Sequence, residues 1–260
     1  MINLKSLKNL KIIAHRGASF DAPENTLASV NLAWVQNIHY VEVDVKLTKD
    51  NIIVVFHDET TIRYNQVDAL LNQYNFKELS AIDVGIFKGK QWKNEFIPTL
   101  EQVLKTIPTN GTLVVELKDG PEMENPLVKL QKKNTKIWNQ LEFISFNYET
   151  ICMTKKIFPN NKCLWLLDLD YDSETTKNIP SNKEIIHKVK QHNLDGINVF
   201  SGKIANKSFF KIMHQENFEI YLWTINKVEH AKQYLPFSPD GLTTDRPKWM
   251  KEQLNMINDK

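Results

Sequence analysis

Two histidines stand at positions from which they could move protons on a bound substrate. His15 and His57 each follow a short apolar run rich in β-branched residues, which is typical of a buried strand. Barrel enzymes carry their reactive groups at the carboxyl ends of parallel strands. The two imidazoles are therefore candidates for a general acid and a general base. Arg16 belongs to the same strand end as His15 and could bind an anion there.

Three acidic residues lie on matching faces of two expected strands. Glu42 and Asp44, with Lys46, alternate with three valines, and Glu116 shares a face with Lys118. If the valines face outward, the carboxylates point into the protein, where a charge is costly unless something cationic satisfies it. A hard divalent cation with oxygen ligands would do so. Ion pairs with Lys46, Lys118 or Arg16 would also do so, and both interpretations stay open.

Other chemically capable residues have simpler explanations. We expect Asp58 to cap a turn or loop, and Cys152 and Cys163 to be buried free thiols. Trp223 is either a core residue or, because it lies near a strand end, a platform for a ligand. The remaining histidines are expected on the surface or in satisfied core positions; they are His39, His187, His192, His214 and His230.

The elements that must position these residues alternate regularly. Leaving aside a hairpin strand at 52–56, about eight strand candidates are separated by helical stretches, which predicts a closed (β/α)8 barrel. A doubly wound open sheet competes with it, but no glycine-rich phosphate fingerprint follows the first strand. The expected parallel strands are 11–13, 40–47, 113–118, 142–146, 162–167, 196–200, 219–225 and 240–244.

Helix signals and one irregular stretch complete the expected fold. Pro23 and Glu24 are suited to the first turn of a helix that runs to about Gln36, and Thr99 can cap another. Residues from about 58 to 96 show weak periodicity and are expected to form a small insertion after the second barrel strand. We expect residues 1–260 to form a single domain with this insertion. Later helices are expected near 126–138, 149–157, 183–191, 205–216, 227–234 and 248–256.

Composition limits the partners of the chain. Its 260 residues carry 33 basic and 31 acidic side chains, a net charge of +2, which argues against a nucleic-acid binder that relies on bulk positive potential. No run approaches the roughly 18 apolar residues of a membrane span, and the first ten residues lack a signal-peptide core. We expect a cytoplasmic protein that acts on a small molecule, with no nucleic acid partner and no stable membrane insertion.

A set of short motifs gives a more specific expectation. In their order and spacing they resemble the glycerophosphodiester phosphodiesterase family, and the resemblance extends to the end of the chain. Each motif is weak alone, but together they are a strong signal. The matching segments are 15–17, 23–26, 42–45, 48–50, 57–58, 97–101, 116–118, 145–147, 196–199 and 241–247.

The resemblance implies a TIM barrel that hydrolyses glycerophosphodiesters to sn-glycerol 3-phosphate and an alcohol, assisted by Mg²⁺ or Ca²⁺. Position by position, His15 and His57 match the catalytic pair. The metal ligands correspond to Glu42, Asp44 and Glu116, and the phosphate-contacting residues to Arg16 and Lys118. Asn37 and Asn51 stand where the family usually has glycine, and residues 63–65 also depart from its pattern; asparagine tolerates positive φ, so both turns can survive.

Two other functions remain open at this point. A phospholipase on lipid phosphodiesters, such as a lysophospholipase D, a phosphatidylinositol-specific phospholipase C or a sphingomyelinase D, would suit the same fold and groups. An exposed apolar rim would favour it, and the sequence shows no compelling one. A catalytically silent barrel that only binds phosphodiesters would be marked by loss of a histidine or an acidic ligand, and none is lost here.

Overall fold

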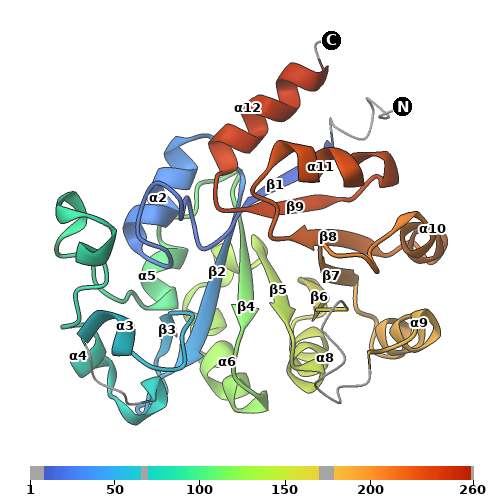
Figure 1. The fold of residues 1–260 in the computed structure, drawn as a ribbon. Helices are drawn as coiled ribbons and strands as arrows, with labels where there is room; N and C mark the ends of the chain where they lie inside the picture. The colour runs from blue at the N-terminus through green and yellow to red at the C-terminus, as the bar shows by residue number, and fades with distance from the viewer. Residues whose placement is uncertain (1–8, 66–69, 170–178, 259–260) are drawn as a thin grey trace.

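The computed structural model describes residues 9–65, 70–169 and 179–258, and in these ranges eight parallel strands form a closed barrel (Figure 1). β1 pairs with β2 on one side and with β9 on the other, which closes the ring. β3 pairs antiparallel with β2 outside the ring. The fold class is therefore confirmed. The strands are β1 (Lys11–Ala14), β2 (Tyr40–Leu47), β3 (Ile53–Val55), β4 (Thr112–Leu117), β5 (Leu141–Ser145), β6 (Lys162–Leu167), β7 (Gly196–Phe200), β8 (Glu219–Trp223) and β9 (Gly241–Thr244).

Helices connect the strands and surround the barrel (Figure 1). The α-helices are α2 (Leu27–Val35), α3 (Ile62–Asn65), α4 (Phe76–Leu79), α5 (Leu100–Leu104), α6 (Glu124–Lys133), α7 (Thr135–Trp138), α8 (Tyr148–Ile157), α9 (Asn182–Gln191), α10 (Lys207–Gln215), α11 (Val228–Tyr234) and α12 (Pro247–Asn258). Short 3₁₀ turns are η1 (Leu71–Gln73), η2 (Ile86–Lys88), η3 (Lys90–Trp92), η4 (Pro121–Met123) and η5 (Leu235–Phe237).

Strand alternation divides the core into two parts. The three valines of β2 belong to the large apolar cluster between barrel and helices, as their spacing predicted. The interior of the barrel holds a separate, smaller cluster. Its buried members are Ile13, Val114, Ile144, Leu164, Leu166 and Tyr221. The acidic residues of β2 therefore share the face that lines this interior.

The amino end of the barrel is filled by a paired set of charges. The Lys11 ammonium lies 2.8 Å from Glu219 Oε2 and donates to the Tyr221 hydroxyl at 2.6 Å. That hydroxyl donates in turn to Glu142 Oε2 at 2.8 Å. Lys162 pairs with Glu219 and lies 3.9 Å from Glu142. Two ammonium groups thus face two carboxylates.

The segment between β2 and α5 contains β3 and several short helical turns. It builds a small apolar cluster of its own from residues at both of its ends. The buried members are Val54, Phe56, Leu71, Leu79, Val84 and Ile97. Arg63, in α3, reaches back from this segment to Glu24 in the loop before α2. The insertion is therefore joined to the barrel beside β2.

Local signals explain most helix ends, with two corrections. Helix α2 begins at Leu27 rather than at Pro23, because Thr26 is its N-cap and Asn25 has a φ of 57°. The expected helix 126–138 is two helices, α6 and α7, which meet at Asn134. Thr99 caps α5 as expected, accepting from the Gln102 N–H at 3.1 Å.

The two asparagines that replace family glycines behave as expected. Asn37 and Asn51 have φ values of 58° and 59°, so each supplies the left-handed conformation that its turn requires.

Among the described residues, none of the helices is long and apolar enough to cross a membrane.

Candidate active site

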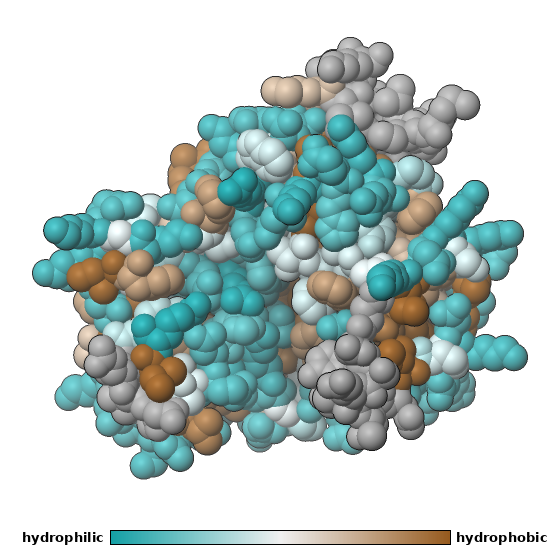
Figure 2. All heavy atoms as spheres, viewed as in Figure 1, coloured by the Kyte–Doolittle hydropathy of each residue, from teal (hydrophilic) through white to brown (hydrophobic). Residues whose placement is uncertain are grey.

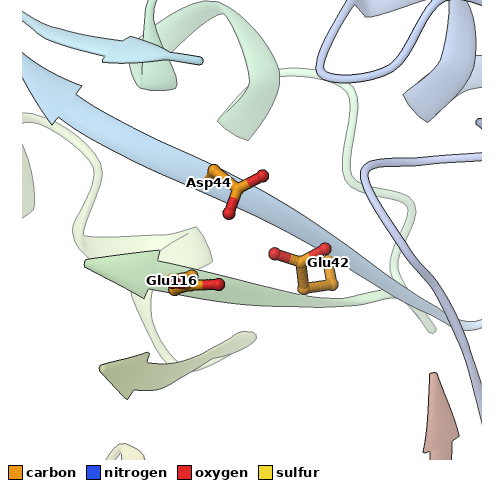
Figure 3. Close-up of side chains that lie close together, drawn as sticks. All are labelled: Glu42, Asp44 and Glu116. Atoms are coloured by element: carbon orange, nitrogen blue, oxygen red, sulfur yellow. The ribbon is translucent and has the colours of Figure 1, made fainter. Parts of the chain in front are cut away.

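Three buried carboxylates converge at the carboxyl ends of β2 and β4. Asp44 lies opposite Glu116 in the pairing of the two strands, and Glu42 is two residues earlier on the same face of β2. Their side chains point toward one another in Figure 3, and one oxygen from each lies within 4.8 Å of the others. The exposed fractions of Glu42, Asp44 and Glu116 are only 2%, 1% and 8%. The three carboxylates therefore lie on the inner face of the barrel, as the alternation of residues along the two strands predicted.

Two cations lie among these acids, so the ion-pair interpretation is correct in part. Arg16 Nε lies 3.1 Å from Asp44 Oδ2. The Lys118 ammonium lies 3.0 Å from Asp44 Oδ1 and 2.7 Å from Glu116 Oε1. Lys46, the third candidate partner, instead pairs with Glu59 at 2.6 Å. Two cations therefore face three carboxylates, which leaves the cluster short of positive charge.

The unequal charge appears in the pKa values. Burial, together with the charges of Asp44 and Glu116, raises the pKa of Glu42 well above its ordinary value. Burial also raises the pKa of Glu116, to about 7. The pKa of Asp44 is lowered, because Lys118 and Arg16 together outweigh the opposing effect of burial. The cluster is one in which another positive charge would stabilise the ionised acids.

The donor atoms fit a divalent metal ion. Glu42 Oε1 is buried without a partner, and Asp44 Oδ1 and Glu116 Oε1 share a single ammonium group, that of Lys118. Buried acceptors without a partner are costly. An all-carboxylate set of oxygens suits a hard cation such as Mg²⁺ or Ca²⁺. These three residues could therefore hold such an ion.

Backbone geometry aims Arg16 and its neighbours at the cluster. Arg16 has a φ of 54°, and its N–H donates to Glu42 Oε2 at 2.8 Å. Gly17 follows with a φ of 80°, and a Cβ there would lie 2.5 Å from the backbone carbon of Ser29. The turn after Arg16 thus requires glycine, which explains the His-Arg-Gly order of the motif.

Asn25 donates its side-chain amide to Asp44 Oδ2 at 2.8 Å and accepts from the Asp44 N–H at 3.1 Å.

Each candidate catalytic histidine is held by a carboxylate through Nδ1. His15 Nδ1 lies 2.7 Å from Asp245 Oδ1, and His57 Nδ1 lies 3.0 Å from Asp58 Oδ1. A carboxylate at Nδ1 favours the tautomer that carries its proton there, which leaves Nε2 as the basic nitrogen toward a substrate. Burial lowers the pKa of His57, with Lys118 and Arg16 acting in the same direction against Asp44.

Both orienting carboxylates are themselves anchored. Asn226 Nδ2 donates to Asp245 Oδ2 at 2.6 Å, and the Ser19 hydroxyl lies 3.3 Å from Asp245 Oδ1. Burial alone would raise the pKa of Asp245, but its hydrogen bond and charge interaction with His15 lower it. Asp58 Oδ2 lies 3.1 Å from Arg63 Nε. The expectation that Asp58 caps a turn is therefore wrong, because its carboxylate bridges His57 and Arg63 instead.

All of the predicted site residues except Asp44 line one pocket of about 210 Å³. Its charged wall contains both histidines, Arg16, Lys118, Glu42 and Glu116, and its other wall is mainly apolar, with Ile144, Phe146, Leu166 and Trp223. The Trp223 ring lies edge-on to Phe146 and Phe200, at centroid distances of 5.6 and 5.3 Å. A larger pocket of about 450 Å³ near Lys11 and Lys251 contains neither the acidic cluster nor the histidine pair.

Sequence reasoning missed the residues that hold this site together. Asp245, Asn226, Asn25, Glu24 and Arg63 act on the predicted groups without belonging to the predicted set. Glu24 accepts from Arg16 at 3.0 Å and from Arg63 at 2.7 Å. Two signals were available: Glu24, Asn25 and Asp245 lie in the family-like segments 23–26 and 241–247, and Asp245 directly follows the expected strand 240–244.

The other histidines and the cysteines take no part in the pocket. His214 and His230 bond to the backbone carbonyls of Phe237 and Ser201. Cys152 and Cys163 are buried free thiols, as expected. Neither group lines the pocket that contains His15 and His57.

A (β/α)8 barrel with acids, histidines and basic groups at the carboxyl ends of its strands has the arrangement of a barrel enzyme, since such enzymes carry their active sites at that face. A sequence profile described as the glycerophosphoryl diester phosphodiesterase family matches residues 15–249. The chain belongs to this family. Membership confirms the expected family, fold and class of enzyme.

Named relatives and a solved structure agree with this assignment. A glycerophosphodiester phosphodiesterase of Caldanaerobacter subterraneus subsp. tengcongensis is 28% identical over 91% of this chain and 94% of its own length. The enzyme of the same name from Bacillus altitudinis is 28% identical over 91% of this chain and 95% of its own. An Oleispira antarctica phosphodiesterase, solved in complex with the product sn-glycerol-3-phosphate, superposes with a TM-score of 0.83. It is 28% identical and covers 96% of this chain and 99% of its own.

Proposed function

We propose that this chain hydrolyses glycerophosphodiesters to sn-glycerol 3-phosphate and an alcohol, with a divalent metal ion and two histidines. The family and the names of the relatives support the reaction. The observation that carries the mechanism is one pocket lined by two carboxylate-held imidazoles beside three buried acids that share only two cations. We further propose that residues 1–260 form one domain that includes the insertion at about 58–96.

Glu42, Asp44 and Glu116 would hold the metal ion, Mg²⁺ or Ca²⁺. When bound, the ion would offset the negative charge that builds on the nonbridging oxygens of the phosphodiester. The ion would also repay the cost of three buried acids that share two cations.

Arg16 and Lys118 bind the phosphate from the same wall. Both side chains are already held near Asp44, so little side-chain entropy is lost when an anion arrives. Glu24 keeps Arg16 in place through the 3.0 Å contact described above, and Arg63 shares that carboxylate. The guanidinium and the ammonium then hold the charged oxygens while the bond to the leaving oxygen breaks.

The two histidines move the protons. His15 Nε2 takes a proton from the nucleophile, and His57 donates one to the departing oxygen; on the route through a cyclic phosphate the two roles are exchanged in the second step. The nucleophile is either the glycerol 2-hydroxyl, which gives a cyclic phosphate that water opens, or water itself. A bound phosphodiester places negative charge near His57, which favours its protonated form and opposes the effect of burial.

Trp223 and the apolar wall bind the uncharged part of the substrate. The ring lines the pocket opposite the charged groups and is supported by Phe146 and Phe200. Apolar contact on one side and charge on the other orient the phosphodiester between the histidines.

The test is release of glycerol 3-phosphate from glycerophosphocholine and glycerophosphoethanolamine. Purified protein is assayed with added Mg²⁺ or Ca²⁺ and with a chelator. The expected result is turnover that the chelator abolishes and a metal restores. Absence of turnover on both compounds with either metal would contradict the proposal, and turnover that the chelator leaves unchanged would contradict its metal dependence.

A further inference from the structure

Exposed apolar side chains gather at the catalytic end of the barrel. Among the described residues, every large exposed apolar side chain except Val35 and Met256 lies at the carboxyl end of a barrel strand, in the connection that follows it, or in the first turn of the helix that ends this connection; the segment between β2 and α5 counts as one such connection. In a parallel barrel these segments surround the active site. They include Phe20, Ile52, Ile62, Leu70, Ile86, Phe87, Phe96, Phe146, Ile179, Phe200, Ile204 and Trp249. In Figure 2 brown side chains stand among teal ones over the insertion, on the left of the view.

Part of this rim alternates aromatic rings with basic groups. We call Phe20, Arg63, Phe87, Lys88 and Arg246 the aromatic-basic ridge. The Arg246 guanidinium lies 3.6 Å from the centroid of the Phe20 ring, and the Lys88 ammonium lies 5.9 Å from the same centroid. The Arg63 guanidinium lies 5.4 Å from the Phe87 ring. Both rings remain about half exposed, at 50% and 47%, so solvent still reaches them.

Short chains of polar contacts connect the ridge to the two histidines of the pocket. Lys88 donates to the Ser19 carbonyl at 2.7 Å, and the Ser19 hydroxyl contacts Asp245, which holds His15. At the other end of the ridge, Arg63 binds Asp58, which holds His57. The ridge therefore lies beside the two carboxylates that hold the histidines of the pocket.

The positive charge of the ridge is only partly neutralised by the protein. Arg63 pairs with Glu24 and Asp58, but in the described ranges neither Lys88 nor Arg246 forms an ion pair with a carboxylate. Acids close to these residues in the chain bond elsewhere: Asp245 holds His15, and Asp83 accepts from the Ile86 N–H. Exposed rings beside unneutralised cations suit a surface that has apolar material beneath anionic phosphates.

We propose that the aromatic-basic ridge docks the mouth of the pocket on a lipid surface that carries anionic headgroups. Phe20 and Phe87 enter the headgroup layer, and Lys88 and Arg246 bind lipid phosphates. Apolar side chains on the far side of the mouth, Phe146 among them, extend the contact around the pocket. A lipid surface is favoured over a protein groove because the exposed groups surround the opening. The docking rests on the proposed function only for its purpose, since binding is measured without turnover.

The test is co-sedimentation with vesicles of phosphatidylcholine alone or mixed with phosphatidylglycerol. Two double variants are compared with wild type: Phe20→Ser/Phe87→Ser and Lys88→Gln/Arg246→Gln. The control is Val35→Ser, which alters an apolar side chain that is 82% exposed at the C-terminal end of α2, away from the ridge. Wild type and Val35→Ser are expected to bind the anionic vesicles at least about tenfold better than neutral ones, and each double variant to lose about tenfold. Added salt should weaken wild-type binding.

Several results would overturn the proposal. They are no binding of wild type to either vesicle, equal binding to both, double variants that bind as wild type does, or a concentration-dependent dimer that the ridge substitutions abolish. Circular dichroism and hydrolysis of soluble glycerophosphoethanolamine show whether each variant is folded. If a double variant does not fold, the single variant Arg246→Gln is tested in its place. Failure of the hydrolysis assay in wild type would count against the proposed function alone.

Discussion

The two ends of the barrel interior both contain charged residues, but they use them differently. At the amino end, Lys11 and Lys162 face Glu142 and Glu219, and the Tyr221 hydroxyl bridges the set. At the carboxyl end, three carboxylates share Arg16 and Lys118, and the buried Glu42 Oε1 has no partner. The first end is satisfied by its own chain, and the second is satisfied only when something else binds.

This difference separates structural from functional charge. Charges that are paired in number and geometry stabilise a closed barrel and leave no open position for a ligand. At the carboxyl end the buried acids outnumber the cations that pair with them, and carboxylates hold the two imidazoles in place. Such an arrangement is prepared to bind a metal ion and an anionic substrate. The large exposed apolar side chains follow the same division. In the described ranges, only Val35 and Met256 among them lie away from the carboxyl end of the barrel.

The largest expected effect comes from removing a histidine at the carboxyl end. His15→Ala and His57→Ala should each lower kcat for glycerophosphodiesters by about 10²–10⁴-fold, the range for loss of a general acid or base. Steady-state kinetics at saturating metal measures the effect. Tyr221→Phe, which removes a buried hydroxyl at the amino end, should leave kcat nearly unchanged. Near-full turnover by either alanine variant would show that its histidine is not catalytic.

The next effect tests Asp245 as a positioning residue. In Asp245→Asn an amide N–H can face His15 Nδ1 and place the ring proton on Nε2, the wrong nitrogen for a base. We expect kcat to fall by about 10²-fold or more with a smaller change in KM, and the pH profile of kcat to shift. Asp240→Asn, which alters an acid bonded to the Ile220 N–H at the amino end, is the matched control. A change in thermal stability without a change in the pH profile would argue for a purely structural role.

A smaller effect, on stability, is expected at the amino end. Lys11→Met removes one of the two ammonium groups that pair with Glu219 and the donor to the Tyr221 hydroxyl, which should lower the free energy of unfolding by about 1–3 kcal/mol. Chemical denaturation measures it, with the exposed Lys105→Met as the control. The kcat of the folded variant should match that of wild type. A loss of kcat without a loss of stability would break the division between the two ends.

The smallest expected effect is a change in acid sensitivity. The pKa of Glu219 is lowered, because Lys11 and Lys162 together outweigh its burial. The unfolded state therefore binds the proton more readily, so this contribution is full above the ordinary glutamate pKa and is lost as pH falls through the folded value. Below about pH 5 the unfolding free energy of Glu219→Gln should fall less steeply than that of wild type. If the unfolding free energies of wild type and Glu219→Gln fall in parallel with pH, the ionised Glu219 carboxylate makes no such contribution to stability.

The sequence predicted the parts of this site that depend on local rules. Strand periodicity placed Glu42, Asp44 and Glu116 on the inner face, and strand ends marked His15 and His57. Both rules act within a few residues, so a single sequence carries them. The valines of β2 and the cap at Thr99 followed for the same reason.

The rest depended on contacts that form only when the ring closes. Asp245 meets His15 because β9 pairs with β1, at a separation of 230 residues along the chain. The expected helix start at Pro23 was wrong because Glu24 is held by two arginines and Asn25 by Asp44, with a positive φ that no helix allows. Asp58 was assigned to a turn because Arg63, which anchors it, lies in the least regular part of the sequence.

The most direct test of the difference between the two ends is calorimetric titration of Mg²⁺ and Ca²⁺ into wild type, Glu116→Gln and Glu142→Gln. Both variants neutralise a buried glutamate inside the barrel, one at each end. The account predicts that wild type and Glu142→Gln bind one divalent ion alike, and that Glu116→Gln binds it at least about tenfold more weakly. Equal binding by all three proteins, or no binding by wild type, would contradict it.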